Sequence, residues 1–215
     1  MKKDVLISVA GIFVILAAGC FIYFIPYGQA AKQQSVEDEM IDEYLEQSLD
    51  IEGVEDKKLD NYEETSMVYA YSDVDSAAYK GEIDSILVID KINLKKAIIR
   101  GEYNDYNLDR YFFVTADQQS KLGTDNYIIY GHCSQTYGHS FNRLEELAAG
   151  DEFQLIQGTK TYHYIVRDVR RELREDAAPY LYTGANTVQL LSCEKKKAEG
   201  YSEKRLIIVT AEQQE

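Results

Sequence analysis

The sequence predicts a mainly β fold, closed into a barrel, for residues 81–215. Short runs of alternating apolar residues recur from residue 83 to residue 211, and polar or glycine-containing loops separate them. Strands this short and this regularly spaced favour a closed barrel over an open parallel sheet. The 215 residues suffice for one core of moderate size with accessory segments.

The individual elements follow from local patterns. Gly158 and Thr159 separate two alternating runs and predict a hairpin turn. Residues 140–147 begin with Ser140, a capping residue type, and space three apolar side chains along one face, which predicts a short helix. Residues 174–183 contain a proline and are expected to form a loop. The expected strands are 83–89, 96–99, 126–130, 152–157, 161–169, 187–192 and 205–211.

Residues 1–27 have the pattern of a membrane signal anchor. Lys2 and Lys3 precede an almost wholly apolar run over 5–25. As a helix this run of about 21 residues spans roughly 31 Å, the thickness of a bilayer core. The lysines are expected to stay in the cytoplasm, which places the rest of the chain outside the cell as a single-pass protein. A cleaved signal peptide and a lipoprotein acylated at Cys20 are the alternatives.

Residues 28–80 are strongly acidic. The chain has 23 Lys and Arg against 37 Asp and Glu, a net charge of −14, which argues against nucleic acid as a partner. Between residues 35 and 64 there are 13 acidic residues and two basic ones, too little apolar surface for a core. We expect a solvated stalk, partly helical or disordered, because Met40, Ile41, Tyr44, Leu45 and Leu49 fall near helical spacing. A lid that folds over a functional site is the alternative.

Two predicted strands end in residues that suit nucleophilic catalysis. Cys193 follows the run 187–192, and His132 follows the run 126–130 with Gly131 between. Arg205 opens the next apolar run after Cys193. A thiol attacks as the thiolate, which a nearby cation favours, and an arginine presents fixed donors to a developing oxyanion. These three residues are therefore the candidate catalytic group.

Other residues of the same types fit this group less well. His139 lies in a polar loop and is the rival to His132, whereas His163 alternates with tyrosines inside a predicted strand. Cys133 adjoins His132 but should point to the opposite face, so we interpret it as a bystander. An odd number of cysteines, three, does not make a disulfide framework.

These motifs, in this order, resemble the sortases, the cysteine transpeptidases of Gram-positive cell surfaces. The family's T-L-x-T-C signature stands here as Gln189-Leu190-Leu191-Ser192-Cys193, with Gln189 departing from the usual threonine. The resemblance covers about residues 81–212 and implies an eight-stranded barrel with one or two short helices. The run 203–211 is similar to class A and the run 104–110 to class B, so the class stays open between them.

The resemblance implies a function and a site. Cys193 would form a thioacyl enzyme with a C-terminal sorting motif like L-P-x-T-G, His132 would protonate the leaving amine, and Arg205 would stabilise the oxyanion. The product would be a surface protein or pilin joined to an amine of a peptidoglycan precursor or of a pilin lysine, outside the cell membrane. The residues expected to bind substrate are Leu191, Ser192, Tyr180, Leu181 and Tyr182.

No cofactor is required for these steps, and calcium is the one possible metal. Some sortases hold calcium with acidic groups near the position of Glu102, Asp105 and Asp109, although solvated loop acids are the simpler interpretation. Three other classes stay as alternatives: an L,D-transpeptidase, a papain-like cysteine hydrolase and a non-enzymatic adhesion module. The two enzymes differ in the order or spacing of Cys, His and Arg, and the adhesion module gives these residues no reason to converge.

Overall fold

A computed structural model describes residues 37–49, 82–101, 112–115, 120–133, 140–181, 184–196 and 200–214. The chain divides into two compact units, Met1–Met40 and Ile41–Glu215. The described part of the first unit is the opening turn of a helix over residues 37–49, and the helix residues from Ile41 onward belong to the second unit. The predicted anchor, residues 1–27, lies outside the described residues. Within the ranges given above, no helix is both long and apolar enough to cross a bilayer.

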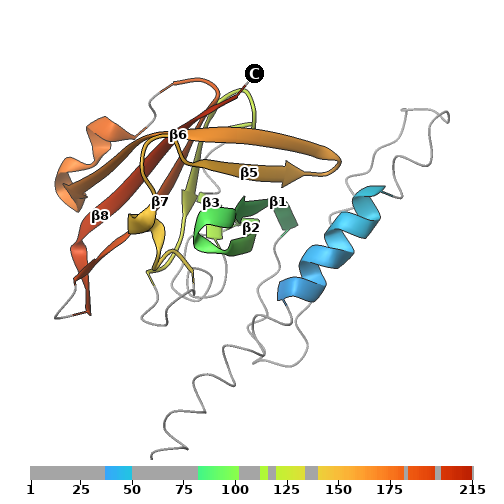
Figure 1. The fold of residues 1–215 in the computed structure, drawn as a ribbon, viewed down its shortest axis with the longest axis horizontal. Coiled ribbons are helices and arrows are strands. Elements are labelled where there is room, and N and C mark those ends of the chain that lie inside the picture. The colour runs from blue at the N-terminus through green and yellow to red at the C-terminus, as the bar shows by residue number, and fades with distance from the viewer. Residues whose placement is uncertain are drawn as a thin grey trace, which may run out of the picture. The chain divides into compact units, whose positions relative to one another are not determined.

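The prediction of a mainly β fold is confirmed. In the described residues the strands pair in a closed ring, in the order β1-β2-β3-β4-β7-β8-β6-β5 (Figure 1). The strands are β1 (Glu82–Ile89), β2 (Leu94–Gly101), β3 (Phe112–Thr115), β4 (Asn126–Tyr130), β5 (Glu152–Gln157), β6 (Lys160–Leu173), β7 (Thr187–Lys196) and β8 (Gly200–Gln213).

Two strand pairs in the ring are parallel, and one of them positions the candidate site. β2 runs parallel to β3, and β4 runs parallel to β7, with Asn126 opposite Thr187 and Tyr130 opposite Leu191. The remaining neighbours are antiparallel, including β6 with β8 and β7 with β8. Because parallel strands point the same way, the residues that follow β4 lie beside the second half of β7.

Side-chain alternation sorts the strands into an inner core and a smaller outer cluster. The inner core takes Val188 and Leu190 from β7, Ile207 and Val209 from β8, and Tyr127 from β4. The outer cluster comprises Ile128, Ala177, Leu191 and Ile208, with Tyr130, Tyr180, Leu181 and Leu206 packed against it. Three neighbouring strands, β4, β7 and β8, are thus covered by apolar residues on both faces, as expected where a loop packs on the outside of a sheet.

Several local predictions need correction. The helix predicted over 140–147 is a turn followed by the 3₁₀ turn η2 (Leu144–Glu146), and Ser140 caps nothing there, because the residue preceding η2 is Arg143 and makes no side-chain cap bond. Ser140 instead has a left-handed φ of 49° and pairs with Cys133 in an isolated bridge. The apolar spacing was still informative, since Phe141, Leu144 and Leu147 are all buried.

Strand lengths were also predicted incompletely. β4 and β5 have the predicted bounds, whereas β6, β7 and β8 extend beyond theirs. β3 was missed, because four residues, Phe112–Thr115, do not present a recognisable alternation. The loop predicted at 174–183 contains two 3₁₀ turns, η3 (Arg174–Asp176) and η4 (Ala178–Tyr180).

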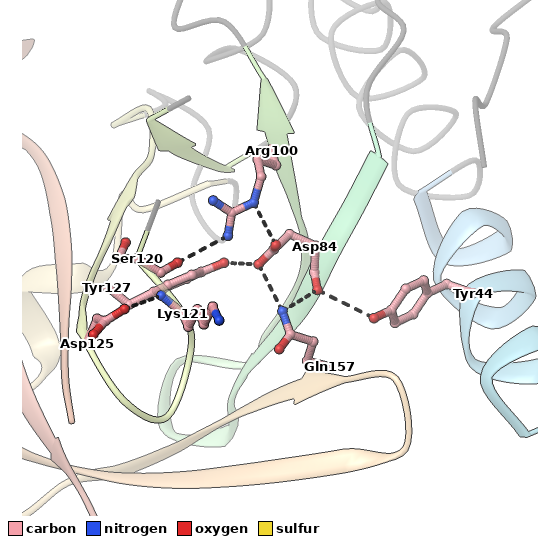
Figure 2. A network of polar contacts seen from close by, with 8 residues as sticks. All are labelled: Tyr44, Asp84, Arg100, Ser120, Lys121, Asp125, Tyr127 and Gln157. Atoms are coloured by element: carbon pink, nitrogen blue, oxygen red, sulfur yellow. Dashed lines mark hydrogen bonds and ion pairs between the residues drawn. The ribbon is translucent and has the colours of Figure 1, made fainter. Parts of the chain in front are cut away.

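A partly buried polar network lies at the end of the barrel where β4 begins (Figure 2). Asp84, at the start of β1, accepts a bond from Arg100 Nε at 2.9 Å and another from the hydroxyl of Tyr127. The amide of Gln157 donates to the Asp84 carbonyl at 3.2 Å. Tyr44, on the helix over 37–49, donates to the same carbonyl at 3.4 Å and accepts from the Gly158 amide at 2.8 Å. Buried polar groups that are all paired in this way fix the register of the elements that carry them.

Candidate active site

The parallel pairing of β4 and β7 directs both strands toward the candidate residues His132 and Cys193. The last pair of this register is Tyr130 with Leu191, and His132 and Cys193 each follow it by two residues. Two hydrogen bonds show that the chains stay together beyond Tyr130: the Gly131 amide donates to the Leu191 carbonyl at 3.0 Å, and the Ser192 hydroxyl donates to the Gly131 carbonyl at 2.9 Å. Neighbouring strands lie about 4.8 Å apart, so continuation of this register predicts that the imidazole and the thiol lie close together.

Cys193 does not end its strand, contrary to the sequence prediction. β7 continues to Lys196, and a bulge interrupts its register with β8 between Cys193 and Glu194. The thiol is half-buried and is not in a disulfide. Bulges commonly lie next to active sites, because they redirect side chains without ending the strand.

The backbone around His132 is held in place. Its carbonyl accepts a hydrogen bond from the Phe141 amide at 2.9 Å, and Phe141 is buried in the inner core. Cys133 is buried at 2% exposure, consistent with its interpretation as a bystander. Of the other histidines, His163 lies exposed on β6 opposite Gln154, and His139 lies outside the described residues.

The arginines around the thiol are arranged differently from the simplest sequence interpretation. Arg205 pairs with Glu194, Nε to Oε2 at 2.9 Å, and its Nη2 contacts the Arg171 carbonyl at 3.5 Å. The Nε of Arg171 lies 3.3 Å from the other carboxylate oxygen of Glu194, Oε1. The guanidinium that reaches the sulfur belongs to Arg174, whose Nη2 lies 3.6 Å from Cys193 Sγ.

The outer apolar cluster leads to Cys193. Leu191, two residues before the cysteine, belongs to this cluster, and Leu206, directly opposite Cys193 on β8, packs against it. Tyr180 and Leu181 of the 174–183 loop pack on the same cluster. Leu191 itself is only 2% exposed, so an extended apolar peptide laid along this face would reach the thiol over the half-buried Tyr180, Leu181 and Leu206. Of the predicted substrate residues, Ser192 is buried and bonded to Gly131, and Tyr182 lies outside the described residues.

Gln189, the position that departs from the family signature, holds the outer loop. Its side-chain amide donates to the Tyr180 carbonyl at 2.6 Å and to the Thr210 hydroxyl at 3.2 Å, and the residue is fully buried. The ring of Tyr180 is also covered by the Arg170 guanidinium, 4.3 Å from its centre. A threonine at position 189 would be too short to reach the Tyr180 carbonyl, so the longer side chain of Gln189 allows this hydrogen bond to the loop.

No cation site is evident around these residues. Within the described parts of the chain, no three His, Cys, Asp or Glu side chains converge as a metal site would require. The calcium candidates Glu102, Asp105 and Asp109 lie outside the described residues. A cavity of about 370 Å³ does occur, but at the other end of the barrel, lined by Arg100, Ser120, Lys121, Leu122, Thr124, Gln157 and Tyr162. It contains none of the predicted site residues.

The sequence analysis missed three residues of the site. Gln189 enters it only as a departure from a motif, and Glu194 does not enter it. Arg174 was treated as the first residue of a loop. The available signal was the arginine-rich end of β6, Arg167, Arg170, Arg171 and Arg174 within eight residues of an acidic chain.

The fold is a barrel with a half-buried thiol on β7 and a histidine two residues beyond the end of β4, and comparison with known proteins gives the family. The sortase-domain model matches residues 87–213. The chain therefore belongs to the sortase family, whose members are cysteine transpeptidases, as the sequence resemblance predicted.

Solved structures with the same fold are also sortases. The sortase A of Listeria monocytogenes has a TM-score of 0.53 and 16% identity, covering 62% of this chain and 88% of that one. The SrtA sortase of Actinomyces oris has a TM-score of 0.54 and 24% identity, covering 62% and 80%. Sortase C-1 of Actinomyces oris has a TM-score of 0.53 and 19% identity, covering 61% and 73%. At these identities the likeness shows the fold and leaves the class open. No curated protein matches the sequence.

Proposed function

We propose that this protein is a membrane-anchored transpeptidase that cleaves a C-terminal sorting motif similar to L-P-x-T-G and transfers the protein to an amine. The observation that carries the proposal is the parallel pairing of β4 and β7, because His132 and Cys193 each follow the last pair of this register, Tyr130 with Leu191, by two residues. Membership of the sortase family supports the reaction type. The apolar run over 5–25 supports the anchor and a catalytic domain outside the cell.

The proposed chemistry has two acyl transfers. In the first, the Cys193 thiolate attacks the carbonyl carbon of the scissile peptide bond, the carbon–nitrogen bond breaks, and the His132 imidazolium gives its proton to the leaving amine. In the second, an incoming amine attacks the thioester, a new amide bond forms, and Cys193 leaves as thiolate while His132 takes the proton of the amine. No redox step and no net consumption of a group on the enzyme are involved.

Arg205 is proposed to bind the carbonyl oxygen as it becomes an oxyanion, because a guanidinium offers paired donors in a fixed plane. In the structure its Nε is bonded to Glu194, so this role requires the ion pair to rearrange when substrate binds. Tyr180 and Leu181, which are half-buried, are proposed to contact the apolar residues of the motif, because they pack on the outer cluster that leads to the thiol. Leu191, at 2% exposure, packs behind them in that cluster.

The partners follow from this reaction. The proposed substrates are surface proteins or pilins with a sorting motif, and the proposed acceptor is an amine of a peptidoglycan precursor or a pilin lysine. The structures of sortase A and sortase C proteins are equally similar to this chain, so the structural comparison does not favour either role.

The test is a transfer assay with the full-length chain purified in detergent. A library of fluorescent pentapeptides that vary around L-P-x-T-G is offered with and without triglycine, diaminopimelate or a lysine peptide, and products are identified by mass spectrometry. We expect cleavage of a subset of motifs, transfer to one amine class, and a thioester on Cys193 that is absent in Cys193→Ala. Turnover that survives in Cys193→Ala contradicts the proposal, and so does action on stem peptides ending in D-amino acids instead.

A further inference from the structure

Strand register divides the charged residues near Cys193 between two faces of the sheet. Cys193 lies directly opposite Leu206, and Leu206 lies directly opposite Glu172, so these three side chains share a face. Arg205 and its partner Leu173 are each the adjacent residue along the strand from Leu206 and Glu172, so their side chains lie on the other face of the sheet. The next residue along the β6 chain, Arg174, returns to the face of the thiol, where its Nη2 lies 3.6 Å from Sγ.

The ion pairs confirm this division. Glu194 follows the bulge after Cys193 and accepts from Arg205 at 2.9 Å and from Arg171 at 3.3 Å. One carboxylate thus holds two arginines on the face away from the sulfur. Glu145 lies 4.0 Å from Arg171 on the same side.

The loop that carries Arg174 is fixed at several points. Ala177, three residues further on, is buried in the outer cluster at 2% exposure. Tyr180 is bonded through its carbonyl to Gln189 and covered on its ring by Arg170. η3 also begins directly after the last β6–β8 pair, Leu173 with Arg205. The position of Arg174 is therefore set by β6 on one side and by the anchored loop on the other, which is the preorganisation that an electrostatic role needs.

We infer that Arg174 is a further catalytic residue of this sortase, the guanidinium that donates to the Cys193 sulfur while Arg205 is held by Glu194. The inference rests on the proposed function and names a residue that it does not include. When the Cys193 proton passes to His132, the sulfur becomes an anion, and Arg174 stabilises it by a charge-assisted hydrogen bond without losing its own proton. The bond to sulfur is released as the sulfur attacks the carbonyl carbon, and it forms again when the thiolate leaves.

The experiment compares four variants of the full-length chain: Arg174→Ala, Arg174→Lys, Arg205→Ala and Arg167→Ala. Arg167 is the matched control, because it also lies on β6 and makes an ion pair, with Glu212 at 2.8 Å, far along the strand from the thiol. Two rates are measured at one pH: modification of Cys193 by iodoacetamide without substrate, followed by mass spectrometry of its peptide, and kcat/KM for motif cleavage. Thermal unfolding of each variant checks that the fold is retained.

We expect Arg174→Ala to slow alkylation by about 10-fold, the loss of one charge-assisted bond to the thiolate, and to lower kcat/KM by about 100-fold. Arg174→Lys keeps a positive charge without the planar fork, so it should recover part of the alkylation rate. Arg205→Ala should leave alkylation within about twofold of wild type, because Arg205 does not face the sulfur before substrate binds. Arg167→Ala should change neither rate.

Two outcomes overturn the inference: alkylation in Arg174→Ala equal to that in Arg167→Ala, or a larger loss of alkylation in Arg205→Ala than in Arg174→Ala. The failure of the proposed function is distinguishable from both. If the wild-type protein cleaves no motif, the transpeptidase proposal fails, while the alkylation comparison still decides whether Arg174 acts on the thiol.

Discussion

The two ends of strand β4 carry polar clusters of opposite character. At its beginning, Asp84, Arg100 and Tyr127 form a network in which the carboxylate is only 10% exposed and the arginine 34%. At its end, around Cys193, the ion pair of Arg205 and Glu194 is 45% and 20% exposed, and Arg171 pairs with the same carboxylate. In the first cluster Arg100 and Tyr127 both donate to Asp84. In the second, the Arg174 guanidinium donates to the Cys193 thiol.

The difference separates a structural use of charge from a catalytic one on the same strand. A paired and buried charge is costly to disturb, because removing one partner leaves the other desolvated. An exposed pair contributes little to stability and can rearrange when a substrate arrives. Substitutions at the first cluster should therefore change the free energy of unfolding, and substitutions at the second should change the rate.

The largest expected effect is on the rate, in His132→Ala. General acid–base catalysis by a positioned side chain contributes about 10²–10⁴-fold, so kcat/KM for motif cleavage should fall by that factor while the free energy of unfolding changes little. His163→Ala, an exposed histidine on β6, is the matched control and should retain wild-type activity. If His132→Ala keeps more than half of the wild-type activity, His132 is not a catalytic residue. The proposed difference between a structural and a catalytic cluster would then lose its main support.

Asp84→Ala should have the largest effect on stability. It leaves Arg100 and the buried Tyr127 hydroxyl without their carboxylate, which should cost about 2–4 kcal/mol of unfolding free energy. The measurement is urea denaturation, with Glu212→Ala as the control, because that exposed partner of Arg167 should cost at most about 1 kcal/mol. Transfer activity per folded molecule should be unchanged in Asp84→Ala. Equal stability losses in the two variants would contradict a structural role for the Asp84 network.

Alkaline pH should weaken the fold through buried tyrosines. Burial raises the pKa of Tyr127 well above its usual value, and burial likewise raises the pKa of Tyr164 to about 12. Above about pH 10 the unfolded chain loses these protons while the folded chain keeps them, so stability is full below pH 10 and falls as pH rises toward the folded values.

Tyr127→Phe tests this linkage. The variant should be less stable than wild type near pH 8 by about 1 kcal/mol, because Asp84 loses a donor. Above pH 10 its stability should fall less steeply, by about 1.4 kcal/mol per pH unit, since one titrating group is gone. Urea denaturation at intervals from pH 8 to pH 11 measures both quantities. Parallel stability curves for variant and wild type would show that Tyr127 does not contribute to the alkaline loss.

The smallest effect is expected for Tyr44→Phe. The hydroxyl of Tyr44 accepts from the Gly158 amide at 2.8 Å and donates to the Asp84 carbonyl, so its removal should cost about 0.5–1.5 kcal/mol. Hydrogen exchange at the Gly158 amide should accelerate by about 10-fold, a change that reports this bond directly. Gln47→Ala, on the same helix and bonded only to Glu43 at the surface, should leave that amide unchanged. Protection of Gly158 that survives in Tyr44→Phe would mean that the helix does not secure the hairpin turn.

Much of the fold and part of the site could be predicted from local sequence. Alternation identified β4 and β5 to the residue, and Gly158 marked the hairpin turn between β5 and β6 with a left-handed φ of 57°. The prediction that Cys193 and His132 belong together followed from their common position after apolar runs, and these two runs are neighbouring parallel strands as far as Tyr130 and Leu191. These features were accessible because side-chain period and turn chemistry act over a few consecutive residues.

Only the tertiary structure decided which groups surround the thiol. The register of β7 with β8 breaks between Cys193, opposite Leu206, and Glu194, opposite Ser202, and nothing in the local sequence marks this break. Glu194 pairs with Arg205 and Arg171 beside it. Gln189 reaches Tyr180 across a loop that returns from another strand. By itself the sequence determined the barrel and the residue types of its site. The partner of each arginine depended on the register of β6, β7 and β8, where a shift of one residue moves a side chain to the opposite face of the sheet.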